Sequence, residues 1–546
     1  MNRSANYPYS RVPGEVLWKT DGYGLNTLYE RSNHDWFHSY NIYGNYTNTF
    51  ADVHHVSATA GVNYETKFFK DIKIQRNDLL SEDLTDFNLA NGDEMSIAGG
   101  KNRYALFGLF YRLNYDYKNR YLFEFSGRYD GSSRFARGHR YGFFPSVSAG
   151  WRINEEKFFA PLRKQISNLK LRFSLGALGN QQVGYYDYLQ TISSGGTISY
   201  AFVDKNKASF ASISAPNASY FTWETVVTKN IGLDLGLLNN RLNMTADIYV
   251  RDTKDMLMAS KDLPNVYGAS SPKTNAANLR TKGWEASISW NDSFNLKGKA
   301  FHYSVVLGLA DNTTKVTKYN NDNKTLGTPY EGQQLGEIWG YVVDGLFKTD
   351  EEAENYPVNQ SYVNNILNIS VKSQGLHAGD VKYVDLDGDN IISPTLSANN
   401  VKDQKVIGNS LPRYTYSVRL AADWNGIDFS ALLQGVGRQH WYPNGETSLF
   451  WGPYARPYCT FIPKDFLTDV WSEDNPDAYF PRPRGYVALD VNPRELSKPN
   501  TRYLQNVAYC RLKNVTVGYS LPRTWLKALH MERVRVYFSG ENLFTF

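Results

Sequence analysis

Carboxylates occupy every second position in the run Asp385-Leu386-Asp387-Gly388-Asp389. This alternation is typical of loops that wrap Ca²⁺ with hard oxygen ligands, in which a glycine makes the sharp turn. An EF-hand loop has a further acidic ligand at its twelfth position, which is Leu396 here. Asp403 can replace it after an apparent insertion, so one hypothesis is a structural Ca²⁺ held by Asp385, Asp387, Asp389 and Asp403. The simpler alternative is an aspartate-rich turn whose carboxylates accept hydrogen bonds from nearby backbone N–H groups.

Aromatic side chains gather in two long stretches, 314–411 and 439–505. Sugar rings have apolar C–H faces that stack on aromatic rings, and nearby polar residues can bond hydroxyl groups or a peptide backbone. The candidate ligand contacts are therefore Trp339, Tyr341, Trp441, Tyr442, Trp451, Tyr454 and Tyr458. For any single ring, the simpler alternative is that it packs the loop or lies in the aromatic girdle of a membrane interface. As a cluster, 441–458 is the best candidate for contact with a ligand or a partner.

The elements that must position these residues are strands with two different faces. From 105 to 117 the odd positions are apolar or aromatic and the even positions include polar and charged residues; the same period recurs at 121–130, 143–153 and 169–177. Such runs exceed the five or six residues typical of soluble strands and suit tilted strands that cross a membrane. The charged residues of the polar face either line a transport path or, more simply, pair across neighbouring strands; they include Arg112, Asp116, Glu124, Arg128, Asp130 and Arg172.

Short and long links alternate along the whole chain. Further strands are predicted at 36–48, 53–67, 223–237, 241–253, 279–292, 300–313, 412–424, 426–438, 506–520 and 533–545. The short links are 49–52, 118–120, 155–168, 238–240, 293–299, 425–426 and 521–532, two of which contain short helical segments at 155–165 and 522–529. A soluble β protein has no reason to keep this order, whereas an outer-membrane barrel has short turns on one side and long loops on the other.

The predicted fold is therefore all-β: a partial transmembrane antiparallel β-barrel of about fourteen strands. One barrel domain spans 1–546, and 314–411 and 439–505 are its large extracellular loops.

Composition argues against several other classes. The net charge is +5 and basic residues are interspersed with acidic ones, so no nucleic-acid partner is expected. No run of about 18 apolar residues predicts a membrane-spanning helix, and no secretory signal is recognised at the start. The four early histidines lack metal-ligand spacing and no phosphate-binding glycine loop is present, so we do not expect an enzyme. Between Cys459 and Cys510, the two cysteines, no disulfide is predicted.

Several motifs resemble one family, in its own order along the chain. They read RYLFEFSGRYDGSSRF at 120–135, FPSVSAGWR at 144–152, LKLRFSLGALGNQ at 169–181, WGYVVDGLF at 339–347, GDVKYVDLDGD at 379–389, IGNSLPRY at 407–414 and GENLFT at 540–545. Together they resemble the SusC/RagA family of TonB-dependent outer-membrane transporters. Because they span most of 101–546, the resemblance is specific.

The resemblance implies a barrel of about 22 strands, filled by an N-terminal plug on which the TonB complex acts. It also implies a SusD-like surface lipoprotein that captures oligosaccharides or peptides. No plug or TonB box is recognised, so the chain is interpreted as an internal part of such a transporter, about strands eight to twenty-one. Unpaired backbone groups in lipid cost several kcal/mol each, so this part alone is not expected to insert as a stable barrel.

The resulting hypothesis is the barrel part of a TonB-dependent, SusC-like importer of glycans or peptides in the outer membrane. No cofactor is expected beyond the Ca²⁺ considered above. The rival hypotheses are a secreted soluble β-rich carbohydrate-active protein and a passive porin or adhesin scaffold. Membrane fractionation separates the importer from the soluble protein, and an upstream reading frame for a plug separates it from the porin.

Overall fold

One large antiparallel sheet dominates the computed structural model, which describes residues 2–4, 27–77, 86–90, 95–201, 207–213, 221–259, 266, 271–363, 376–444, 447–454, 462, 464–483, 495–527 and 530–546. Within these residues the sheet has fifteen strands, and each strand pairs with the next one of the sheet along the chain. The strands are β1 (Asn2–Ser4), β2 (Thr27–Phe50), β3 (His54–Asn77), β4 (Met95–Tyr117), β5 (Tyr121–Ser132), β6 (Tyr141–Arg152), β7 (Ile166–Asn180), β10 (Glu224–Leu237), β11 (Leu242–Ala259), β12 (Lys273–Leu296), β13 (Lys299–Lys318), β18 (Arg413–Trp424), β19 (Ile427–Arg438), β22 (Tyr509–Ser520) and β23 (Arg535–Thr545).

The register of this sheet places the apolar side chains on one continuous face. Leu109 lies opposite Val62 on one side and Tyr129 on the other, and Tyr129 lies opposite Phe143. Directly paired residues of an antiparallel sheet share a face, so these side chains form a row across four strands. Leu109, Tyr129 and Phe143 are exposed although they are large and apolar. The predicted two-faced sheet is confirmed, with an apolar face that is exposed. This apolar face is called the outward face below, and the polar face is called the inner face.

Tight turns make the predicted short links. Asn425 and Gly426 join β18 to β19, and both have positive φ angles, 50° and 86°. A two-residue hairpin turn of this kind requires left-handed backbone at both positions, which asparagine and glycine tolerate best. At Gly426 a Cβ atom would also lie 2.7 Å from the carbonyl oxygen of Ser520. Both the positive φ angle and this close approach therefore require glycine.

The strands are longer than predicted at their loop ends. β3 continues to Asn77 and β4 begins at Met95. The link between the strands predicted at 53–67 and 103–117 is therefore 78–94 instead of 68–102. Hydrogen bonding between strands does not depend on side-chain polarity, so pairing continues where the apolar alternation has already ended. Both predicted helical turns contain short helices: the 3₁₀ helices Ile153–Glu155 and Lys157–Leu162, and α4 (Arg523–Lys527).

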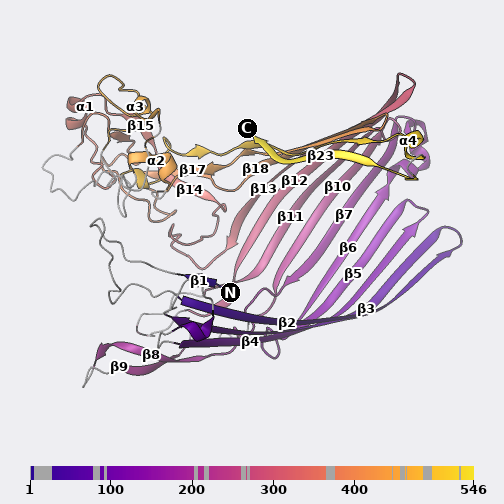
Figure 1. The fold of residues 1–546 in the computed structure, drawn as a ribbon, viewed down its shortest axis with the longest axis horizontal. Helices are drawn as coiled ribbons and strands as arrows, with labels where there is room; N and C mark the ends of the chain where they lie inside the picture. Colours follow the sequence, from indigo (N-terminus) through magenta and orange to yellow (C-terminus); the bar gives the residue numbers. More distant parts are fainter. Residues whose placement is uncertain are drawn as a thin grey trace.

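The short turns and the larger loops lie at opposite ends of the strands (Figure 1). At the loop end are the strand pairs β8 (Ile192–Ala201) with β9 (Lys207–Ile213), β14 (Glu337–Tyr341) with β17 (Gln404–Asn409), β15 (Val343–Leu346) with β16 (Val381–Tyr383), and β20 (His440–Trp441) with β21 (Gln505–Asn506). The same end carries α1 (Asp350–Glu354), α2 (Ser448–Trp451), α3 (Phe466–Asp469) and the 3₁₀ helices Phe87–Leu89, Gly452–Tyr454 and Glu495–Ser497.

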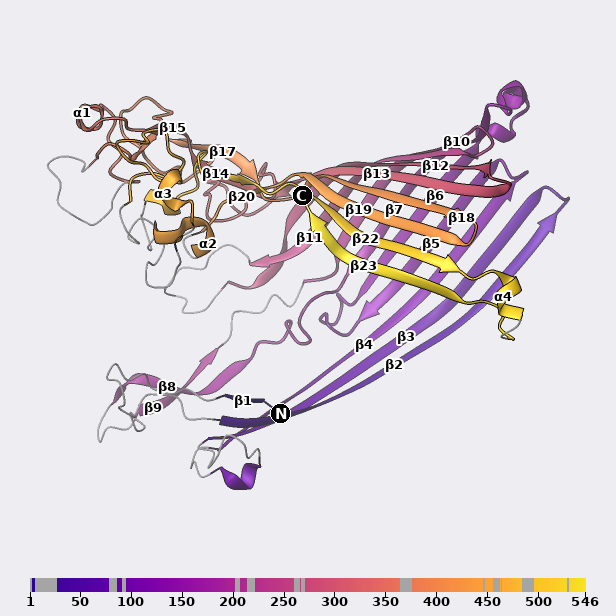
Figure 2. The ribbon, with the colours of Figure 1, turned by 45° about the horizontal axis from the view of Figure 1, so that its top comes forward.

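The sheet is curved but open. Its edges are formed by β1 and β2 at one side and β23 at the other, and Figure 2 shows that these edges do not meet. The predicted partial, open β-barrel is thus confirmed. Among the residues placed in the structure, no helix has the length and apolar character needed to cross a membrane.

Candidate functional site

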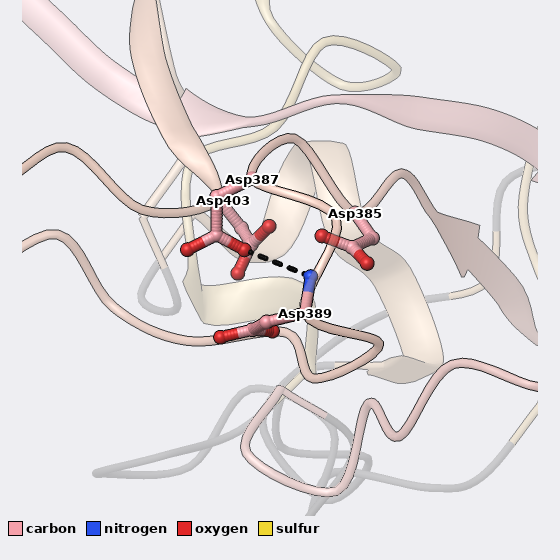
Figure 3. A group of neighbouring side chains, drawn as sticks. All are labelled: Asp385, Asp387, Asp389 and Asp403. Carbon is pink, nitrogen blue, oxygen red and sulfur yellow. Dashed lines mark hydrogen bonds between the residues drawn. The ribbon is translucent and has the colours of Figure 1, made fainter.

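The four carboxylates predicted from the sequence come together in the loop between β16 and β17 (Figure 3). Asp385, Asp387, Asp389 and Asp403 each offer one oxygen atom, and these oxygens all lie within 4.8 Å of one another. Ca²⁺ binds oxygen at about 2.3–2.6 Å, so ligands on opposite sides of the ion are roughly 5 Å apart. The separation therefore suits one calcium ion. Gly388 has a φ of +79°, which explains the glycine at the turn.

Hydrogen bonds within the loop also satisfy these carboxylates. Asp385 accepts from the backbone N–H groups of Gly388 and Asn390, both at 2.7 Å. Asp403 accepts from those of Leu386 at 2.8 Å and Ser393 at 2.7 Å. The loop thus has the geometry of the aspartate-rich turn as well.

A lysine supplies positive charge at this loop. The Nζ atom of Lys402 lies 2.7 Å from a carboxylate oxygen of Asp387 and 3.4 Å from one of Asp389. An ammonium group next to two carboxylates competes with any divalent cation for the same oxygens. The calcium ion therefore stays a prediction.

The carboxylates differ in their electrostatic surroundings. Burial raises the pKa of Asp403 above its ordinary value, and the neighbouring charges of Asp387 and Asp385 raise it further. The hydrogen bond from Lys402 lowers the pKa of Asp387. Metal ligands must be deprotonated, so Asp403 is the group whose protonation would limit cation binding first as the pH falls.

The seven aromatic candidates separate by burial. Trp451, Tyr454 and Tyr341 are 0%, 1% and 1% exposed, so protein covers their ring faces. Trp339 and Tyr442 are half-buried, whereas Trp441 is 41% exposed. Tyr458, like Cys459, lies outside the described residues; the other cysteine, Cys510, is a free thiol. A ligand-stacking role stays a prediction, and Trp441 is the described ring most open to it.

The buried rings belong to a core shared by the two longest loops. This loop core contains Tyr341, Leu346, Val358, Val363, Val381, Tyr383 and Ile392 from the first loop, and Trp451, Tyr454, Phe466, Val470, Leu496 and Tyr503 from the second. Trp451 packs against Phe450 and Tyr503, with ring centroids 4.8 and 5.2 Å apart. The two loops therefore form one packed unit, which is called the loop unit below.

Backbone hydrogen bonds also join the two loops. The N–H of Tyr341 donates to the carbonyl of Pro499 at 2.9 Å, and the N–H of Thr501 donates to the carbonyl of Tyr341 at 3.0 Å. The N–H of Arg482 donates to the carbonyl of Gly379 at 2.7 Å. The loop unit is thus held by its backbone as well as by its core.

Glu337 is a central residue that the sequence analysis missed. The Trp339 indole N–H donates to its carboxylate at 2.9 Å, and the Tyr330 hydroxyl makes a short hydrogen bond to the same group. Burial and the Glu337 carboxylate raise the pKa of Tyr330 to about 12. Glu337 and Trp339 are two residues apart on β14, so they share a face. That spacing is the only signal in the sequence, because Tyr330 lies outside the strand.

The charged residues of the inner face are largely paired. Arg112 pairs with Glu124 at 2.6 Å, and Arg172 pairs with Asp234 at 3.0 Å and Asp247 at 2.8 Å. These cross-strand pairs confirm the simpler prediction for the inner face.

Three of the predicted residues of the inner face behave differently. Arg128 pairs at 2.8 Å with Asp130 of its own strand instead of a neighbouring one. Asp116 accepts a hydrogen bond from the backbone N–H of Asn119 at 2.6 Å and so caps the turn after β4. For these residues the cross-strand prediction was wrong. The residues opposite Arg128 on the neighbouring strands are Phe110 and Phe144, and those opposite Asp130 are glycines, so no charged partner lies across from either.

Known proteins are similar to this chain in sequence and in fold. The family described as TonB dependent receptor-like, beta-barrel, matches residues 2–543. The chain belongs to this family. TonB-dependent receptor P39 of Formosa agariphila is 28% identical over 96% of this chain and 50% of its own length, and TonB-dependent receptor SusC of Bacteroides thetaiotaomicron is 27% identical over 81% and 40%. The chain thus spans about half the length of the receptor P39.

A solved structure with the same fold is that of the RagAB peptide transporter. It superposes with a TM-score of 0.74 at 22% identity, over 99% of this chain and 54% of that one. The predicted resemblance to SusC/RagA proteins is confirmed.

The loop core predicts a stability difference between two tryptophans. Replacing the buried Trp451 by alanine should destabilise the loop unit by about 3–5 kcal/mol, because it leaves a large cavity. Limited proteolysis should then cut both loops faster while the sheet stays protected. Trp441→Ala, which removes an exposed ring, is the control and should change little. Faster cleavage of only one loop would contradict a shared core.

The acidic loop predicts competition between calcium and Lys402. In calorimetric titration with Ca²⁺, Asp387→Ala should abolish the binding heat, whereas Lys402→Gln should bind at least as tightly because the competing ammonium is gone. Binding should weaken as the pH falls towards the raised pKa of Asp403, since protonation removes a ligand. Identical heats for the unmodified protein and Asp387→Ala would leave only the aspartate-rich turn.

Proposed function

We propose that the chain forms the barrel wall of a TonB-dependent, SusC-like importer of oligosaccharides or peptides in the outer membrane. The observation that carries this proposal is the division of one long-stranded sheet into an exposed apolar face and an ion-paired polar face. In water the apolar face would be costly, and in a soluble protein a second layer would cover it. A lipid bilayer covers it at no cost.

The outward face has the layered composition of a membrane barrel. Phe173, Ile231, Ile248 and Trp284 form one row across β7, β10, β11 and β12. Nearer the turns, Phe294, Phe301 and Trp424 form an aromatic row. Aromatic residues are enriched where a barrel meets the membrane interface. Trp284 and Phe294 are ten residues apart on β12, which is about 33 Å along a strand. This distance suits a tilted strand that crosses one bilayer.

The inner face suits a transport path rather than catalysis. Its ion pairs leave polar, mostly neutralised walls, and transport through such a wall needs no covalent chemistry by its residues. In this proposal the TonB complex acts through a plug domain of the whole protein, and a SusD-like lipoprotein sits on the loop unit. Support comes from the family and from the named relatives SusC and RagAB.

Membrane residence predicts that the two faces respond differently to charge. Leu233→Arg adds a charge to the outward face of β10 and should cost about 2–4 kcal/mol near the bilayer midplane. Thr245→Arg, on the inward face of β11 beside Asp234, is the matched control and should be tolerated. The yield of heat-modifiable full-length protein in outer-membrane fractions measures both. Equal yields, or the protein in the soluble fraction, would contradict a membrane wall.

Import predicts a conditional loss of uptake. Cells lacking the full-length gene should lose TonB-dependent uptake of a fluorescent oligosaccharide mixture or of a fluorescent peptide mixture, and complementation should restore it. Removing TonB should abolish the same uptake. Uptake that persists without TonB would favour a passive porin.

A further inference from the structure

The inner face has a hollow where most of its side chains are short. A cavity of about 370 Å³ lies along β11, β12, β13, β18 and β19, and this volume is within the usual range for ligand sites, about 300–1,000 Å³. The residues that line it on the inner face form two adjacent rows: Glu285, Ala310 and Thr415, then Ser287, Gly308, Ser417 and Gln434. This cavity is called the wall trough.

The trough is open because its central positions carry almost no side chain. Gly308 lies opposite Ser287 and Ser417, and Ala310 lies opposite Glu285. A Cβ atom at Gly308 would come within 2.8 Å of the hydroxyl oxygen of Ser417, so a larger residue would fill the space. The glycine therefore leaves room above the wall and keeps the serine hydroxyl accessible.

At one end of the trough a carboxylate lacks a cation. Glu285 is exposed, and its side chain forms no ion pair or hydrogen bond with any other described residue. It lies directly opposite Asp247 of β11, whose carboxylate is already bonded by Arg172 at 2.8 Å and by the side-chain amide of Asn230 at 2.7 Å. Like charges directly opposite each other repel, so Glu285 favours a cation from a ligand.

At the other end of the trough an arginine lacks an anion. Arg419 lies two residues beyond Ser417 on β18, and hence on the same face. It is exposed, and no carboxylate among the described residues pairs with it. The residues directly opposite it are Val306 and Leu432, which offer no charge. A guanidinium group can bind a carboxylate by two parallel hydrogen bonds, so Arg419 favours a ligand with this group.

The two free charges are too far apart to neutralise each other. Glu285 and Arg419 lie two strands apart, about 10 Å, and four residue steps apart along the strands, about 13 Å. Their backbone positions are therefore about 16 Å apart across the trough. An extended peptide rises about 3.3–3.6 Å per residue, so a peptide of about three to five residues spans the gap between the two side chains.

Opposite charges at the two ends define the chemistry of the ligand. A peptide with free termini carries an ammonium group at one end and a carboxylate at the other. Its backbone also offers donors and acceptors to Ser287, Ser417 and Gln434. A neutral oligosaccharide uses neither charge, and an acidic one is attracted by Arg419 but repelled by Glu285.

We propose that the wall trough binds a short extended peptide, with its N-terminal ammonium at Glu285 and its C-terminal carboxylate at Arg419. The inference rests on the proposed import function and selects peptides as its cargo. It adds a cargo site on the barrel wall that is separate from the loop unit.

The test measures peptide binding by the full-length protein in detergent, using calorimetric titration. The probes are tetraalanine with free termini, its N-acetylated form, its C-amidated form and the neutral tetrasaccharide maltotetraose. The variants Glu285→Gln and Arg419→Gln each remove one charge from the trough. The matched controls Asp423→Asn and Arg251→Gln remove charges of the inner face that lie outside the trough and have no ion-pair partner among the described residues. Heat-modifiable migration shows that each variant is folded.

The Glu285→Gln variant should bind free tetraalanine about tenfold more weakly than the unmodified protein. It should bind the N-acetylated form with unchanged affinity, because that form has no ammonium group. The Arg419→Gln variant should show the same loss for the free peptide and no change for the C-amidated form. Both control variants should keep the affinity of the unmodified protein, and maltotetraose should bind at least about tenfold more weakly than tetraalanine.

Equal affinity for the free and the two blocked peptides would overturn the proposal, as would unchanged binding in either trough variant. An equal loss in Arg251→Gln, or maltotetraose binding as tight as that of the peptide, would also overturn it. Uptake by cells separates this outcome from the proposed function. TonB-dependent uptake of the oligosaccharide mixture alone would overturn the peptide site and leave the importer in place, whereas no TonB-dependent uptake would refute the importer itself.

Discussion

The pairing of backbone N–H and C=O groups within one continuous sheet is the constraint on which the rest of this structure depends. In lipid an unpaired backbone group costs several kcal/mol, and here an unbroken ladder runs from β1 to β23. Once the strand pairing is fixed, the two-residue period of the side chains determines which residues lie on which face of the sheet. One face must be apolar and the other can be charged. Only the two edges of the open sheet leave the constraint unmet within the described residues.

The inner face can carry charged side chains because lipid is excluded from it. Exposed ion pairs contribute only about 0–1 kcal/mol each, so the pairs on this face do little for stability. Their effect is to neutralise. Arg172 of β7 reaches Asp234 of β10 and Asp247 of β11, and so holds charge balanced over three neighbouring strands. Such a lining is polar without strongly attracting one sign of charge.

The sequence predicted the strands well because their signal is local and periodic. The ends of β3 and β4 were placed less well, since pairing continues past the last apolar residue and only the partner strand decides where it stops. The proximity of Asp385, Asp387 and Asp389 followed from their spacing. The approach of the Lys402 ammonium did not, because nothing in the spacing says which side chain turns towards the carboxylates.

The burial of individual loop residues could not be predicted from the sequence. Trp451 and Trp441 are the same residue type in the same stretch, yet one is enclosed and the other is exposed. A loop without a period gives no face to assign, so the residue type suggests a ligand contact equally for both. Glu337 was overlooked for a related reason: its importance comes from Tyr330 and Trp339, which converge only in three dimensions.

The shared loop core has a consequence for how this protein can change over evolutionary time. Tyr341 and Tyr383 of one loop pack in the same core as Trp451 and Tyr503 of the other. The backbone of Tyr341 also forms hydrogen bonds with the backbone of Pro499 and Thr501. A change of volume in one loop must therefore be matched in the other. Relatives that diversify their outer surface should exchange the two loops as a pair, with correlated substitutions at positions as far apart in the sequence as Tyr341 and Tyr503.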